Sequence, residues 1–162
     1  MPPPPCDRGQ PTPRADRESA GNDEPQKRPP VAFHLVLAAE PAALSLIRGR
    51  LRQWLKAYQW PDAELEDLVL AVSEAASNAV EHAYPPGVLG NVEVGGRVIV
   101  VPDGSWMVEL TVRDHGCWRP IPERSENRRR GIPLMKATLA ELVIDGTDQG
   151  TCVSMRSRSV GR

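Results

Sequence analysis

Cysteine is scarce in this sequence, and its few copies lie far apart. Cys6, Cys117 and Cys152 are the only three among 162 residues, and none belongs to a Cys-x-x-Cys pair. An odd number of widely spaced cysteines argues against a disulfide framework and against a structural zinc site. The three histidines also fall in separate segments, which argues against a histidine metal cluster. Reduced thiols in the cytoplasm fit this pattern.

Long apolar runs and a strong net charge are missing as well. The first ten residues, MPPPPCDRGQ, have no apolar core of the kind found in secretory signals, and no later stretch is long and apolar enough to span a bilayer. The formal net charge is −1 at pH 7, which gives no reason to expect direct binding to nucleic acid or to an anionic membrane. We therefore expect a cytoplasmic protein that binds neither.

The chain divides into a proline-rich beginning and one region able to fold. Residues 1–30 hold nine of the 17 prolines and almost no apolar residue, which predicts a disordered tail. Residues 31–158 are long enough for one domain with a hydrophobic core. Residues 159–162 are left as a short C-terminal tail.

Apolar periodicity predicts a strand and two helices in the first half of this domain. Residues 31–39 are rich in β-favouring residues and indicate a strand. A helix follows from Pro41, a residue well suited to a first helical position, to Tyr58. A second helix begins at Asp62 and ends near Tyr84, before a Pro-Pro-Gly segment that cannot continue it.

The second half is richer in strands. Residues 97–101 and 105–114 form a predicted hairpin across a Pro-Asp-Gly turn, after a glycine-broken passage. The remaining elements are a polar mobile loop, a short helix and two strands, at residues 120–131, 132–139, 142–145 and 151–158. Grouped helices and hairpin-linked strands predict a two-layer α+β sandwich, with one mostly antiparallel sheet covered on one face by helices.

The second helix carries one polar pair of interest. Glu74 and Asn78 are four residues apart in DLVLAVSEAASNAVEHAY and therefore share one helical face. Leu70 and Ala71 make that face less polar than a solvated one and suggest that something covers it. A solvated face is the ordinary interpretation of such a pair, and a ligand site is the alternative; the helix alone leaves both open.

Four short motifs follow one another along the chain. They are Glu74-x3-Asn78 on a helix, Asp114-x-Gly116 after a strand, Arg130-Gly131-Ile132 where the loop closes, and Gly150-Thr151 at the start of the last strand. In this order the chain resembles the GHKL ATPase fold, also called the Bergerat or histidine-kinase-like ATPase fold. Its segments SEAASNAVEHAY and RDHGCWRP are similar to the anti-sigma factor serine/threonine-protein kinase branch. The resemblance covers roughly residues 31–158.

The resemblance implies a role for each matching residue. Asn78 would give a neutral oxygen to Mg²⁺, which takes its other oxygens from nucleotide phosphates and water. Glu74 would act as the base toward the attacking hydroxyl. Asp114 would accept a hydrogen bond from the adenine amino group, and Gly116 would let the backbone approach the ring.

The resemblance also implies roles for the two remaining motifs. Gly150 and Thr151 would complete the adenine pocket, and Arg130 and Gly131 would contact the nucleotide from the lid. The family's lid usually closes with Gly-x-Gly and an apolar residue, whereas Arg129-Arg130-Gly131-Ile132 carries a single glycine, and an arginine in place of the first glycine restricts the backbone angle φ. The neighbouring arginines at 128 and 129 fit either a triphosphate contact or a solvated basic loop, and both interpretations stay open.

The function implied is that of an ATP-dependent protein-serine kinase acting as an anti-sigma factor. It would bind a sigma factor and phosphorylate a small anti-sigma factor antagonist on serine, with ATP and Mg²⁺ as cofactors. Members of this family commonly pair, so a homodimer is a further expectation. The alternative is a nucleotide-binding regulatory module that sequesters a partner without effective phosphoryl transfer, which the single-glycine lid allows.

A third hypothesis, the catalytic domain of a sensor histidine kinase, is disfavoured. Such a domain would need a partner or an upstream dimerisation helix that bears a phosphoacceptor histidine. Residues 1–30 contain no histidine and too many prolines to form one.

Overall fold

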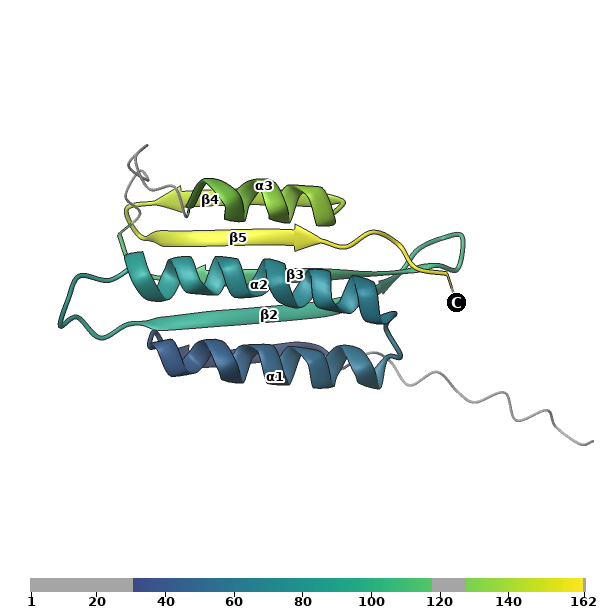
Figure 1. Ribbon diagram of the computed structural model, residues 1–162, viewed down its shortest axis with the longest axis horizontal. Helices are drawn as coiled ribbons and strands as arrows, with labels where there is room; N and C mark the ends of the chain where they lie inside the picture. The colour runs from purple at the N-terminus through teal and green to yellow at the C-terminus, as the bar shows by residue number, and fades with distance from the viewer. Residues whose placement is uncertain (1–30, 118–127, 162) are drawn as a thin grey trace, which may run out of the picture.

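The computed structural model describes residues 31–117 and 128–161 as a two-layer α+β sandwich (Figure 1). The elements are β1 Phe33–Ala38, α1 Pro41–Ala57, α2 Asp62–His82, β2 Asn91–Val100, β3 Trp106–Asp114, α3 Arg128–Thr138, β4 Glu141–Thr147 and β5 Gly150–Arg156. The strands form one sheet in the order β1-β2-β3-β5-β4, and each neighbouring pair is antiparallel. Figure 1 shows α1, α2 and α3 on one face of that sheet, which confirms the predicted fold class.

The hydrophobic core lies between the helices and the sheet. In β3, Val108, Leu110 and Val112 are buried and alternate with residues that point to the open face. Leu51 of α1 and Val72 of α2 are fully buried among the side chains that cover them. Within the described part of the chain, no helix has both the length and the apolar character needed to cross a bilayer.

β2 is longer than predicted. The strand was expected at residues 97–101, after a glycine-broken passage, but it runs from Asn91 to Val100 and includes Gly95 and Gly96 of that passage. It pairs with β1 on one side and β3 on the other, and this pairing outweighs the poor strand propensity of glycine. The close packing also needs glycine, because a Cβ atom on Gly96 would lie 2.8 Å from Cδ2 of Leu110.

α3 begins four residues earlier than predicted. The helix was expected from Ile132, with Arg130 and Gly131 closing a loop, but α3 starts at Arg128 and contains both residues. That part of the prediction was wrong, because arginine is a good helix former and Gly131 lets the first turn pack closely against α2. The rest of the predicted mobile loop, up to residue 127, and the predicted tail 1–30 lie outside the described residues.

A row of alternating charges crosses the open face of the sheet. Arg97, Glu109, Arg156 and Glu141 occupy directly opposed positions on β2, β3, β5 and β4. Nε of Arg97 donates to Oε2 of Glu109 over 2.6 Å, and Nη2 of Arg156 donates to Oε1 of Glu109 over 2.6 Å. Nη1 of Arg156 lies 2.9 Å from Oε2 of Glu141. The hydrogen bond from Arg156, with further help from Arg97, lowers the pKa of Glu109.

The packed part of the chain extends past the predicted boundary at residue 158. Val160 was expected in a C-terminal tail, but it forms an antiparallel bridge with Trp106 at the start of β3. The N–H of Trp106 donates to the carbonyl of Val160 over 2.9 Å, and the N–H of Val160 donates back over 2.8 Å. The Val160 side chain is buried, so this residue belongs to the core.

Candidate functional site

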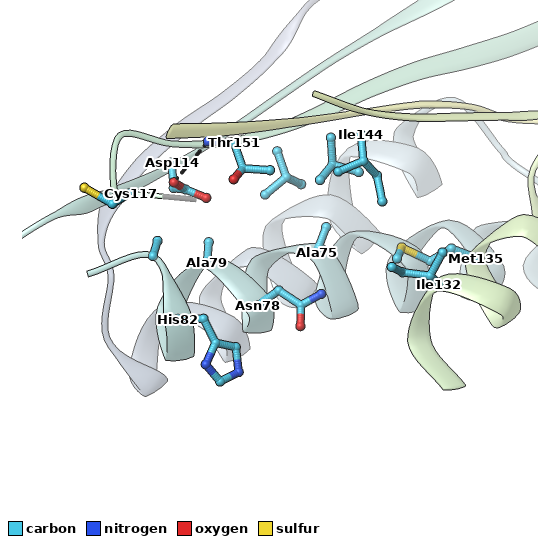
Figure 2. A pocket seen from close by; sticks show the side chains of 13 residues that line it. Ala75, Asn78, Ala79, His82, Asp114, Cys117, Ile132, Met135, Ile144 and Thr151 are labelled. Atoms are coloured by element: carbon cyan, nitrogen blue, oxygen red, sulfur yellow. Dashed lines mark hydrogen bonds between the residues drawn. The ribbon is translucent and has the colours of Figure 1, made fainter. Parts of the chain in front are cut away.

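A cavity lies between α2, α3 and the neighbouring ends of β3 and β5 (Figure 2). Most of its lining is apolar, and Ala75 and Ala79 on α2 leave room for it because their side chains are small. Three of the predicted site residues, Asn78, Asp114 and Thr151, meet in this lining. A mostly apolar cavity with a few convergent polar groups is the usual form of a small-molecule site.

Asp114 is the buried acid of the cavity. It is the last residue of β3 and only 7% exposed. Its Oδ1 accepts a hydrogen bond from the N–H of Gly116 over 3.1 Å and another from the N–H of Thr151 over 3.2 Å. Figure 2 shows the Asp114 side chain beside Thr151, above α2. The two backbone donors fix the orientation of a carboxylate that accepts hydrogen bonds within an apolar wall.

Two glycines allow the close backbone contacts around this acid. A Cβ atom on Gly116 would overlap the carbonyl of Ala83, which instead accepts a hydrogen bond from the N–H of Cys117 over 3.1 Å. Gly150 has φ of +131°, and a Cβ atom there would overlap the carbonyl oxygen of Asp114. Only glycine fits either position without strain. Both predicted glycines therefore support the turn and are not among the residues that line the cavity.

α2 brings Asn78 to the cavity and holds Glu74 one turn earlier. Ala71 and Ala75 are 1% and 3% exposed, so this part of the helical face is packed, whereas Leu70 is 39% exposed and is not covered as expected. The cover expected from the sequence is α3, whose Gly131 lies against the Glu74 carboxylate. Glu74 is half-buried and is not part of the cavity lining.

α3 lines the cavity through Ile132, the residue that follows the predicted site residues Arg130 and Gly131. Arg130 and Gly131 lie in the first turn of α3, where Gly131 contacts Glu74. The next residue, Ile132, lines the cavity together with Met135 one turn later (Figure 2). Of the two predicted lid residues, Gly131 lies against Glu74 and is not among the residues that line the cavity.

Two polar lining residues were not predicted as site residues. His82 lies one turn beyond Asn78, and its Nε2 is 3.2 Å from Oε2 of Glu81. The four-residue spacing from Asn78 was the available signal for this position. Cys117 lines the cavity because it directly follows the Asp114–Gly116 turn. It is an exposed free thiol.

The family model of the histidine kinase-like ATPase domain matches residues 37–157. The chain belongs to this family. The match covers nearly all of the described domain, including α2, the Asp114 turn and the start of β5. The predicted resemblance to the GHKL fold is thereby confirmed, and an ATPase domain of this family uses ATP.

Curated relatives of this ATPase domain are named as kinases and anti-sigma factors. The serine-protein kinase RsbW of Bacillus licheniformis is 30% identical over 127 residues, which cover 72% of this chain and 79% of the relative. The anti-sigma F factor of Geobacillus stearothermophilus is 26% identical over 136 residues, which cover 76% of this chain and 90% of the relative. These relatives confirm the predicted resemblance to the anti-sigma factor serine kinase branch and the prediction of a kinase-class enzyme.

A solved structure shows the same fold. The crystal structure of the RsbU and RsbW domains of Rv1364c from Mycobacterium tuberculosis matches with a TM-score of 0.63 and 28% identity. The match covers 82% of this ATPase domain's chain but 34% of the other chain, so this protein spans about a third of that structure.

Proposed function

We propose that this ATPase domain is an ATP-dependent protein-serine kinase that acts as an anti-sigma factor. It binds a sigma factor and phosphorylates a small anti-sigma factor antagonist on serine. The observation that carries the proposal is the buried Asp114 carboxylate, held by two backbone donors in an apolar cavity that Asn78 also lines. The names of the relatives support the choice of protein substrate and partners.

The cavity suits an adenine base better than a guanine base. A fixed carboxylate accepts hydrogen bonds, and adenine presents an amino group that donates one. Guanine carries a carbonyl oxygen at the corresponding position, and two acceptors facing each other disfavour binding. Apolar side chains such as Val112, Ile144 and Val153 line the remaining walls and match the faces of a planar ring. Thr151 completes this end of the pocket, and Gly150 allows the close backbone contact with Asp114 behind it.

Asn78 is the proposed protein ligand of Mg²⁺. Among residues 31–117 and 128–161, no group of three or more His, Cys, Asp or Glu side chains is placed to hold a metal ion. An amide oxygen is a hard ligand that suits Mg²⁺, which commonly binds through one or two protein oxygens with substrate phosphates and water. When bound, the ion would neutralise charge on the phosphates. Asn78 fits the role of a single protein ligand beside phosphates and water, because it lines the cavity.

Glu74 is the proposed catalytic base. It accepts the proton of the substrate serine while the serine oxygen bonds to the γ-phosphorus of ATP. The bond between that phosphorus and the bridging oxygen breaks, and ADP leaves. Arg130, in the first turn of α3, is proposed to contact the triphosphate, since a helix N-terminus and a guanidinium both favour an anion.

Labelled ATP and candidate antagonists test this function. Purified protein is incubated with both, and the antagonist is analysed by mass spectrometry for phosphoserine. We expect transfer by the wild type and none by Glu74→Gln, which should still bind ATP. ATP binding without transfer by the wild type would favour the sequestering module instead.

The predicted homodimer stays a prediction, and light scattering at several protein concentrations tests it separately.

A further inference from the structure

Tyr84 joins three segments behind the Asp114 turn. Its hydroxyl donates to the carbonyl of Asn91 over 2.6 Å. It accepts hydrogen bonds from the N–H of Asn91 over 3.2 Å and from the N–H of His115 over 2.9 Å. A hydroxyl has one donor and two acceptor positions, so all three are in use. This one group connects the end of α2, the start of β2 and the residue that follows Asp114.

Gly90 leaves the space that the ring of Tyr84 occupies. A Cβ atom on Gly90 would overlap three carbon atoms of the ring, so the ring occupies the space that any other side chain would need. The N–H of Cys117 donates to the carbonyl of Ala83, the residue before Tyr84. The turn is therefore fastened to the end of α2 at two points, on either side of Gly116.

We propose that Tyr84 is a positioning residue that sets the angle at which Asp114 meets the nucleotide base. The inference rests on the proposed ATP binding. Tyr84 is not among the residues that line the cavity, so it acts through the backbone. The Tyr84 hydroxyl accepts a hydrogen bond from the N–H of His115, which lies between Asp114 and Gly116. The N–H of Gly116 in turn donates to Oδ1 of Asp114 and orients it.

The inference predicts a loss of base selectivity rather than a general loss of binding. Without the hydroxyl, the N–H of His115 lacks its partner and the turn is free to shift. Hydrogen bonds weaken steeply when donor and acceptor are misaligned, so the bond from the adenine amino group weakens first. The proposed contacts to the triphosphate come from α2 and α3 and should be unaffected.

The test is the substitution Tyr84→Phe, with dissociation constants for ATP and GTP measured by calorimetry in Mg²⁺. We expect the ATP constant to rise by about tenfold and the GTP constant to stay the same. The matched control is Tyr58→Phe. The Tyr58 hydroxyl lies 3.3 Å from the carbonyl of Val31, and its ring contacts Trp106 at the opposite end of β3 from Asp114. Tyr58→Phe should leave the ratio of the ATP and GTP dissociation constants unchanged.

A second variant and a second measurement keep the inference separate from the proposed function. Gly90→Ala keeps the hydroxyl but displaces the ring, and it should lower the ATP-to-GTP preference in the same way. A folded Tyr84→Phe protein with the wild-type preference, or with equal losses for both nucleotides, would overturn the inference. A wild type without preference for ATP would instead remove the proposed function. In that case, hydrogen exchange at the His115 amide tests whether Tyr84 fixes the turn. The exchange rate should rise in Tyr84→Phe, and an unchanged rate would overturn the inference.

Discussion

Gly131 of α3 lies directly against the carboxylate of Glu74 on α2. A Cβ atom at position 131 would lie 2.8 Å from Oε2 and 3.7 Å from Cδ of Glu74. Because Oε2 is the free end of a flexible side chain, an added methyl group would turn the carboxylate aside more easily than it would move either helix. The position of the proposed base therefore depends on a missing side chain in the neighbouring helix.

Replacing Gly131 by alanine should separate stability from catalysis. Alanine is favoured over glycine inside a helix by about 1 kcal/mol, so the melting temperature should hold or rise. Displacement of Glu74 should slow phosphoryl transfer by about 10- to 100-fold, while the dissociation constant for ATP stays the same. Gly49→Ala in α1 is the control, because no atom lies within 4 Å of its added Cβ. Full transfer activity in Gly131→Ala would show that the placement of Glu74 does not matter.

Asp114→Asn should change which base the cavity accepts. The amide oxygen can keep the two bonds from the backbone N–H groups of Gly116 and Thr151, so the fold should survive. The amide nitrogen then faces the base as a donor, which opposes the adenine amino group. We expect ATP affinity to fall by about 10- to 100-fold and GTP affinity to rise. Calorimetry with both nucleotides measures this, and unchanged ATP affinity would rule out a base contact at Asp114.

Asn78→Ala should remove the dependence of nucleotide binding on Mg²⁺. In the wild type, ATP should bind more tightly with Mg²⁺ than with a chelator, whereas the variant should bind equally in both conditions. Ser77→Ala is a matched control on the same helix turn, since the Ser77 hydroxyl donates to Glu81 and the residue is not in the cavity lining. A variant that keeps its Mg²⁺ response would exclude Asn78 as the ligand.

Gly150→Ala should destabilise the protein and weaken ATP binding together. The new methyl group would overlap the Asp114 carbonyl, and φ of +131° is itself unfavourable for alanine, at about 1–3 kcal/mol. Gly104 also has positive φ, at +84°, but has open space around it. Gly104→Ala should therefore cost stability without affecting nucleotide affinity. Urea unfolding and ATP titration of both variants give the comparison, and intact binding in Gly150→Ala would contradict it.

Glu109→Gln should alter the pH dependence of stability. Arg156 and Arg97 lower the pKa of Glu109 in the folded chain, so its contribution is present above the ordinary glutamate pKa. That contribution disappears as the pH falls through the lowered value. The wild type should therefore exceed the variant in unfolding free energy near pH 7, and the difference should shrink below about pH 4. Urea unfolding at several pH values measures it, and a constant difference would contradict the assignment.

Local patterns were sufficient for most of the fold. The apolar stripe of α2 and the Pro-Pro-Gly segment after it predicted that helix to within two residues at its end. β2 could not be predicted in full, because its glycines are tolerated only through pairing with two neighbouring strands. The start of α3 was missed for a related reason, since Gly131 suits a helix only because α2 lies against it.

The site was predicted only in part, because some of its features also depend on contacts between elements. Asn78, Asp114 and Thr151 stand within recognisable motifs, and the fold brings them into one lining. Tyr84 ends the segment SEAASNAVEHAY, but its proposed role could not be read from that segment, because it depends on contacts with Asn91 and His115 outside it. Motif order therefore identified the groups that would touch a ligand, but not the residue that holds one of them in place.

The alternating charges on the open face also constrain how the strands align as the chain folds. If the inward face is to stay apolar, β2 can slip along β3 only in steps of two residues. The shortest slip in either direction would bring Arg97 opposite Met107 or Thr111 instead of Glu109, and the ion pair would be lost. The same slip would move Asp114 away from its position opposite Val92. Charges on the far side of the sheet thus help to select the alignment in which the acid reaches the cavity.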